Sequence, residues 1–147
     1  MQDVIEQEIS ISASLERVWD LVSAPGWWVP TEAPVPVDRT PGSTTVRVSE
    51  KYGTFPVQVV EMKPRTYVAF RWASQFPNTE LEPGHSTLIE FFISEAADAV
   101  LVKVRESGFA HLNAPDETRQ AGVKANTEGW QHELGELKLH SEEATAA

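Results

Sequence analysis

The chain has 147 residues, no cysteine and a formal net charge of −10 at pH 7. The lack of cysteine excludes a disulfide framework and a thiolate metal site, and the acidic balance disfavours nucleic acid and anionic membranes, which attract basic surfaces. No apolar run approaches the ~20 residues that span a bilayer, and residues 1–12 have neither the basic nor the apolar region that is expected of a signal peptide. We therefore expect one soluble, cytoplasmic domain over residues 1–147, with an ordered core over about 4–140 and a flexible tail at 141–147.

The first elements are predicted to be a strand and a short helix. Residues 4–12 alternate between apolar and polar side chains, which is typical of a half-buried strand. The next segment carries a helical apolar stripe, with Ser14 as its expected N-cap and Pro25 at its end. Residues 27–43 contain four prolines and are predicted to form a loop.

Five further strands are expected over residues 44–51, 54–62, 66–73, 86–94 and 99–108, with short links that favour antiparallel pairing. Alternation places Val46, Val48 and Glu50 on one face of the first of these strands. The second strand is ambiguous, because Gln58, Val60 and Met62 compete with a rival row of Val57 and Val59. The core-facing rows of the other three strands are predicted to contain Phe70 and Trp72, Ile89 and Phe91, and Val102, Val104 and Glu106.

The last segment is predicted to be a long amphipathic helix of about 25 residues. Asn113 is a possible N-cap, and Val123, Trp130, Leu134 and Leu137 recur at helical spacing. A sheet with one apolar face needs a cover, and this helix is large enough to provide it. The sequence therefore predicts an α+β fold in which a curved antiparallel sheet of about six to seven strands wraps around the C-terminal helix.

Small and polar residues at core-facing positions suggest a cavity beneath this helix. Asn126 and Gly129 lie beside the apolar stripe, and alternation aims the Glu106 carboxylate at the core, where it is costly unless hydrogen-bonded, paired or near water. An apolar pocket with a few polar groups is the usual form of a small-molecule site. The expected ligand-binding residues are Val48, Gln58, Val60, Met62, Phe70, Trp72, Ile89, Phe91, Val102, Val104, Glu106, Asn126 and Trp130.

The sequence contains no established catalytic or metal-binding motif. There is no HExxH, GxSxG, P-loop or GxGxxG, and the four histidines are scattered. We expect no metal and no cofactor, and Glu106 is only a weak catalytic candidate.

Several segments together resemble a known superfamily. They are "ISASLERVWDLVS", the double tryptophan at 27–28, "MKPRTYVAFRW", "STLIEFFI", "VRESGF" and "NTEGWQHELGELKLH". These segments are similar to the SRPBCC (START-like, helix-grip) superfamily and, within it, to the activator of heat-shock-protein-90 ATPase homologue family in its single-domain form. The resemblance implies a helix-grip fold with a cavity between the sheet and the last helix, and it supplies no catalytic signature to carry over.

Three functions follow as alternatives. The first is binding of a small apolar, neutral or cationic ligand by a monomer or homodimer. The second is a cyclase or dehydratase reaction with Glu106 as general acid or base. The third is a chaperone-regulating protein-interaction module.

Overall fold

The computed structural model describes residues 3–31, 36–73, 76, 78, 81 and 84–146. In chain order these residues form β1 (Val4–Ile11), α1 (Leu15–Val22), β2 (Thr44–Ser49), β3 (Gly53–Lys63), β4 (Tyr67–Trp72), β5 (Thr87–Ala96), β6 (Ala99–Ser107), the 3-10 turn η1 (Phe109–His111) and α2 (Asp116–Ala146).

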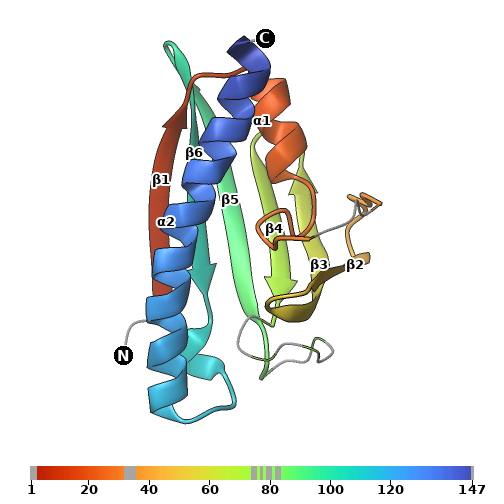
Figure 1. Cartoon of the computed structure of the whole chain (residues 1–147), viewed down its shortest axis with the longest axis vertical. Helices are drawn as coiled ribbons and strands as arrows, with labels where there is room; N and C mark the ends of the chain where they lie inside the picture. The colour runs from red at the N-terminus through yellow and green to blue at the C-terminus, as the bar shows by residue number, and fades with distance from the viewer. Residues whose placement is uncertain are drawn as a thin grey trace.

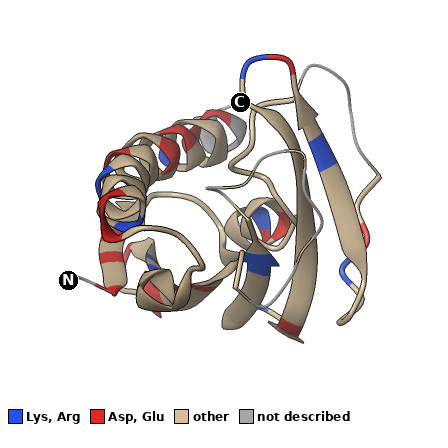
Figure 2. Cartoon of the chain, turned by 90° about the horizontal axis from the view of Figure 1, so that it is seen from below, with Lys and Arg blue, Asp and Glu red and all other residues tan. Residues whose placement is uncertain are grey.

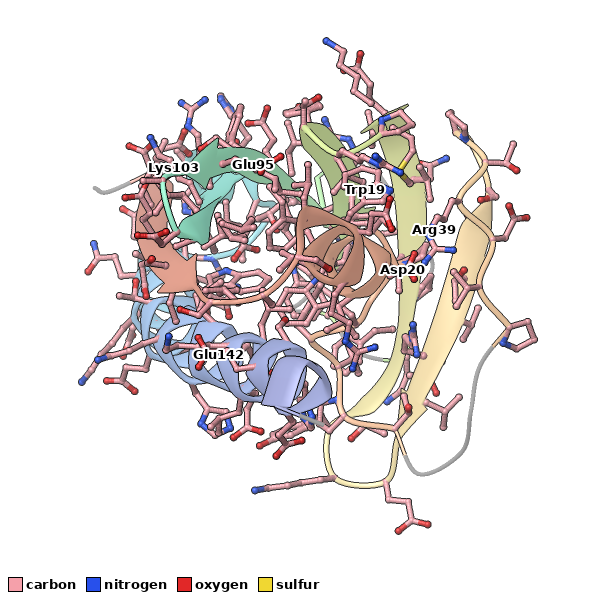
Figure 3. All side chains as sticks on the ribbon, turned by 90° about the horizontal axis from the view of Figure 1, so that it is seen from above. Trp19, Asp20, Arg39, Glu95, Lys103 and Glu142 are labelled. Carbon is pink, nitrogen blue, oxygen red and sulfur yellow. The ribbon has the colours of Figure 1, made fainter. Side chains whose placement is uncertain are left out.

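The strands form one antiparallel sheet in the order β1-β6-β5-β4-β3-β2. Strands β2 to β6 follow one another as a meander, and β1 joins the far edge beside β6. The sheet curves into an arc around α1, and α2 lies across the open side (Figures 1 and 3). The predicted helix-grip architecture is confirmed.

The two helices begin where local chemistry allows. The Ser14 hydroxyl accepts a hydrogen bond from the Arg17 backbone N–H at 3.1 Å, which confirms the predicted N-cap. Helix α2 begins at Asp116 rather than directly after Asn113, and its acidic first turn suits the positive end of the helix dipole. Residues 141–146, which we expected in a flexible tail, continue α2, and Ser141 is fully buried.

The predicted facing of β2 is wrong. Val46 and Val48 are 48% and 56% exposed, and Glu50 is exposed in the following turn, whereas Thr45, Arg47 and Ser49 are buried. The Arg47 Nε–H donates to the Pro25 carbonyl at 2.9 Å, so the guanidinium is tied to the loop after α1. A long side chain with an apolar stem can occupy an inward position when its head finds such a partner.

A bulge decides the facing of β3. Opposite β4, Val59 pairs with Phe70 and Glu61 with Ala69, so Val60 is the extra residue. Before the bulge, the row of Val57 and Val59 is the one that faces the core. Both valines are buried, and Gln58 and Val60 lie on the outer face. After the bulge the alternation shifts, and Met62 packs partly against the core.

Strands β4, β5 and β6 face as predicted. Val68, Phe70, Ile89, Phe91, Val102 and Val104 are all fully buried in one core. Charged residues lie mostly on the outer surface, and acidic positions follow α2 (Figure 2). None of the helices that the structure describes is long and apolar enough to cross a membrane.

Candidate functional site

Glu106 lies at the centre of a buried hydrogen-bond cluster between β6 and α2. Its side chain is inaccessible to solvent. One carboxylate oxygen accepts hydrogen bonds from Trp72 Nε1 at 2.9 Å and Thr87 Oγ1 at 2.5 Å. The other oxygen accepts from Asn126 Nδ2 at 3.0 Å and Trp130 Nε1 at 2.8 Å. The carboxylate thus joins strands β4 and β5 to helix α2 through four donors.

The environment of Glu106 has opposing effects on its ionisation. Burial raises the pKa of the Glu106 carboxyl, and the four hydrogen bonds act in the opposite direction. Because all four donors surround the carboxylate and none of it reaches solvent, a bound molecule cannot contact Glu106 without displacing Trp72, Trp130 or Asn126. This geometry fits a positioning residue better than an acid or base that touches substrate.

The loop after α1 places two tryptophans inside the arc of the sheet. Gly26 has φ +76°, and a Cβ there would lie 2.7 Å from the Arg47 side chain, so only glycine allows the loop to approach this closely. The Trp28 ring is 5% exposed and lies 5.4 Å, centroid to centroid, from both Trp72 and Trp130. The space that we predicted beneath α2 is therefore largely filled by Trp27 and Trp28.

The indole N–H groups of these two loop residues differ from those of Trp72 and Trp130. Neither Trp27 Nε1 nor Trp28 Nε1 has a hydrogen-bond acceptor among the described residues, although both are buried. The Trp28 ring meets the Trp72 ring at 90°, an edge-to-face arrangement that is favourable for aromatic pairs.

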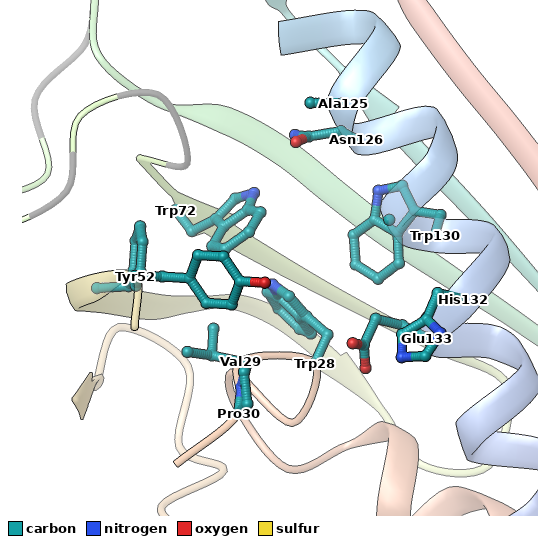
Figure 4. A pocket seen from close by; sticks show the side chains of 12 residues that line it. Trp28, Val29, Pro30, Tyr52, Trp72, Ala125, Asn126, Trp130, His132 and Glu133 are labelled. Atoms are coloured by element: carbon teal, nitrogen blue, oxygen red, sulfur yellow. The ribbon is translucent and has the colours of Figure 1, made fainter. Parts of the chain in front are cut away.

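A pocket of about 480 Å³ remains between α2, this loop and the start of β3. We call it the aromatic pocket, and it is lined by Trp28, Val29, Pro30, Tyr52, Phe55, Trp72, Ala125, Asn126, Gly129, Trp130, His132 and Glu133. Figure 4 shows Trp72 and Trp130 on opposite sides of the space, with Trp28 between them and the Tyr52 hydroxyl pointing towards α2. Since Glu106 binds the indole N–H groups of both walls, it fixes the width of the aromatic pocket.

One face of α2 forms the side of the aromatic pocket. Asn126, Gly129, Trp130 and Glu133 follow one another at spacings of three, one and three, which places them on a common helical face. Gly129 is exposed, and a Cβ there would meet nothing within 4 Å. Our placement of Gly129 on the sheet-facing side of the helix is thus wrong, because the residue borders the opening of the aromatic pocket instead.

The titratable groups of the aromatic pocket are Glu133, His132 and Tyr52. Burial raises the pKa of the Glu133 carboxyl; the nearby Glu136 acts in the same direction, and His132 and His140 act against it. The carboxylate of Glu133 points from α2 towards Trp28 (Figure 4). Among the described residues that line the aromatic pocket there is no lysine or arginine.

The structure brings together only part of the predicted ligand-binding set. Trp72, Asn126 and Trp130 line the aromatic pocket, and Glu106 lies directly behind them. The exposed Val48 and Val60 cannot face the space under α2, and Gln58 lines a hollow on the outer face of the sheet with Arg71 and Leu88. The rest are core or core-flanking residues that line no described pocket: Met62, Phe70, Ile89, Phe91, Val102 and Val104.

Sequence reasoning missed several lining residues. Trp28 stood in a segment predicted to be an open loop, and Phe55 belongs to the rival row of β3. Glu133 could have been found, because it lies three residues after Trp130 on the same helical face. Tyr52 carried no signal, since its position depends on the turn between β2 and β3.

No group of three or more His, Asp or Glu side chains that could hold a metal ion occurs among the described residues.

Hydrogen bonds connect the segment after α1 to the helix. Arg39 lies beside Asp20 (Figure 3); its Nε–H donates to the Ser23 hydroxyl at 2.7 Å, and its Nη2 donates to the Asp20 carbonyl at 2.9 Å.

The curved sheet and the long covering helix define a helix-grip fold, with a pocket between them. The family described as Activator of Hsp90 ATPase homolog 1-like protein matches residues 12–142. The chain therefore belongs to this family. No curated protein sequence matches it.

Solved structures of similar fold cover nearly the whole chain. DynU16, from the dynemicin biosynthetic locus, is 20% identical with a TM-score of 0.72 over 97% of this chain and 48% of its own. This chain thus spans about half the length of DynU16. The Aha1 dimer from Colwellia psychrerythraea is 19% identical with a TM-score of 0.68, covering 93% of this chain and 94% of its own. Protein BH1534 from Bacillus halodurans is 17% identical with a TM-score of 0.70, covering 96% and 97%.

Proposed function

We propose that this protein binds a small, largely apolar ligand in the aromatic pocket. The observation that carries the proposal is the wall structure: Trp28, Trp72 and Trp130 surround about 480 Å³ of space, and Glu106 fixes two of the three rings. Ligand sites are commonly concave, aromatic-lined spaces of roughly 300–1,000 Å³ with a few polar groups that orient the ligand. Asn126, Tyr52 and Glu133 are the polar groups available for that purpose.

Preorganisation supports binding over a purely structural role for the aromatic pocket. A wall residue that is already fixed loses little conformational freedom when a ligand arrives, and this lowers the entropic cost of binding. Trp72 and Trp130 each have two rotatable side-chain bonds and a hydrogen bond that fixes the ring. Both rings are therefore held in position before the ligand enters.

A titration with the neutral fluorophore N-phenyl-1-naphthylamine tests the proposal. We expect saturable enhancement of its emission, with matching quenching of tryptophan. The variant Gly129→Leu should fold normally and weaken binding, because its side chain extends from a position that borders the aromatic pocket. Gly135→Leu is the matched control: it also meets no atom within 4 Å of its Cβ, but it does not line the aromatic pocket. Linear, unsaturable enhancement, or equal behaviour of the two variants, would count against the proposal.

A further inference from the structure

We infer that the aromatic pocket selects an organic cation: a small molecule with an alkylammonium or quaternary ammonium group on an apolar body. This inference rests on the proposed binding function and adds the charge of the ligand to it. Three independent features of the aromatic pocket carry the argument: its ring faces, its single carboxylate and the absence of a competing cation among its described lining residues.

The ring faces provide the first argument. A cation is attracted to the face of an aromatic ring within about 6 Å of its centroid, most strongly for tryptophan, and desolvation strengthens the attraction. Trp72 and Trp130 lie on opposite sides of the space, with Trp28 between them (Figure 4). Both side rings donate their N–H to the Glu106 carboxylate. Such a bond polarises its donor and leaves the indole more electron-rich, so these rings are stronger partners for a cation.

The carboxylate of Glu133 provides the second argument. It is half-buried, it points towards Trp28, and no Lys or Arg of the described chain pairs with it. A partly desolvated carboxylate that no lysine or arginine pairs with is unfavourable, and a bound cation relieves this cost. The charged or titratable groups around it are Glu136, His132 and His140 on α2, with Tyr52 across the aromatic pocket.

The third argument is the negative charge of the surroundings. The lining contains no lysine or arginine among the described residues, and the whole chain carries a formal charge of −10. One lining ring already has such a contact within the chain: Lys51 Nζ lies 5.1 Å from the centroid of the Tyr52 ring. The lining thus contains an aromatic ring that contacts an ammonium group in the free protein. An anionic ligand would meet Glu133 at close range and be repelled.

A pair of probes that differ only in charge tests the inference. Benzyltrimethylammonium and neopentylbenzene have the same shape, with a quaternary nitrogen in one and a carbon in the other. We expect the cation to bind at least about tenfold more tightly in tryptophan-fluorescence titrations. Both probes gain the same apolar contact, and only the cation also gains cation–π contact and attraction to the carboxylate.

Two variants locate the effect. Glu133→Gln should weaken binding of benzyltrimethylammonium about five- to tenfold and leave neopentylbenzene unchanged. Glu128→Gln is the control, because Glu128 is exposed on α2 and lines no described pocket. It should change neither affinity.

The outcomes separate the two levels of the proposal. Equal affinity for both probes overturns the inference and leaves the binding function standing. If neither benzyl probe nor the fluorophore binds saturably, both the inference and the proposed binding function are overturned. A choline lipid headgroup carries the same chemistry, so co-sedimentation with phosphatidylcholine vesicles is measured in parallel. If the protein sediments with the vesicles and benzyltrimethylammonium releases it, the natural cation belongs to a lipid headgroup. If the protein binds the soluble probe but does not sediment with vesicles, the natural cation is a free small molecule.

Discussion

Glu106 is the residue whose environment determines most about the aromatic pocket. Its carboxylate accepts four hydrogen bonds, and two of them come from indole N–H groups that can only donate. Thr87 could reverse its role by rotating its hydroxyl, but the tryptophans could not. The cluster is therefore complete only when an acceptor oxygen faces each tryptophan.

Glu106→Gln should destabilise the protein by about 1–3 kcal/mol, the cost of one buried polar group without a partner. Glutamine supplies a single acceptor oxygen, so the N–H of either Trp72 or Trp130 faces an amide N–H. Chemical denaturation measures the loss, and Glu128→Gln, an exposed position on α2, serves as the control. Equal stability of the Glu106 variant and the wild type would mean that the cluster contributes no net stability.

The raised pKa of Glu106 gives a second prediction, for the pH dependence of stability. In the unfolded chain the carboxyl titrates near its ordinary value of 4.5, and burial raises the pKa in the folded state. The folded state then binds more protons over this interval, so the contribution of Glu106 to stability falls as pH rises from 4.5 through the folded pKa. We expect the difference in unfolding free energy between the wild type and Glu106→Gln to shrink as pH rises across that window. An advantage that grows with pH would show that the hydrogen bonds outweigh burial.

Gly108, at the end of β6, is fixed by its backbone conformation. Its φ of +99° lies in the region that side chains with a Cβ disfavour, although a Cβ would meet no atom closer than 3.9 Å. Gly108→Ala should therefore cost about 1–2 kcal/mol through backbone strain alone. Thermal unfolding measures the loss, and an unchanged Tm would show that the turn into η1 relaxes without cost.

At the scale of the elements, two glycines of α2 behave in the opposite way. Gly129 and Gly135 have helical backbones and open space around the position of a Cβ. Alanine at either position should stabilise α2 by up to about 1 kcal/mol, because glycine is the costlier residue in a helix interior. A rise in Tm for both variants is the expected result. Only Gly129→Ala should also alter ligand affinity, since only Gly129 lines the aromatic pocket.

The elements also show how far the sequence could be interpreted. Alternation predicted β4, β5 and β6 correctly because each has one row of large apolar residues, whereas the opposite row includes charged side chains. It failed on β2, where the inward row is Thr45, Arg47 and Ser49 and the outward row holds valines. Periodicity identifies two faces but not which one is inside, and here a hydrogen bond to the distant Pro25 carbonyl accompanies the reversal.

The candidate site was predicted less completely than the fold, for a related reason. Glu106, Asn126 and Trp130 follow from regular periodicity within one element. Trp28 and Tyr52 reach the aromatic pocket from a loop and a turn, whose paths depend on contacts far away in the chain. The extra residue in β3, Val60, could not be recognised either, because a bulge leaves no separate pattern in a single sequence.

At the scale of the whole molecule, the net charge of −10 should assist capture of a cation. Added salt shortens the Debye length from about 30 Å at 0.01 M to about 3 Å at 1 M. The affinity for benzyltrimethylammonium should therefore fall as salt is added, while that for neopentylbenzene should not fall. Parallel titrations over this range measure the difference. Identical salt responses would show that the charge of the protein plays no part in binding.

The place of β1 in the sheet has a consequence for biosynthesis. β1 is made first, yet among the described strands it pairs with β6 alone, the last of the six, and the helix that it contacts comes later still. The meander from β2 to β6 can form from neighbouring segments as they leave the ribosome. A nascent chain must carry β1 unpaired, with Ile5 and Ile11 uncovered, until Ser107 has emerged. Late closure of this kind is slow and leaves apolar strand surface open to other chains, so β1 is the segment of the half-made protein that is most exposed to aggregation.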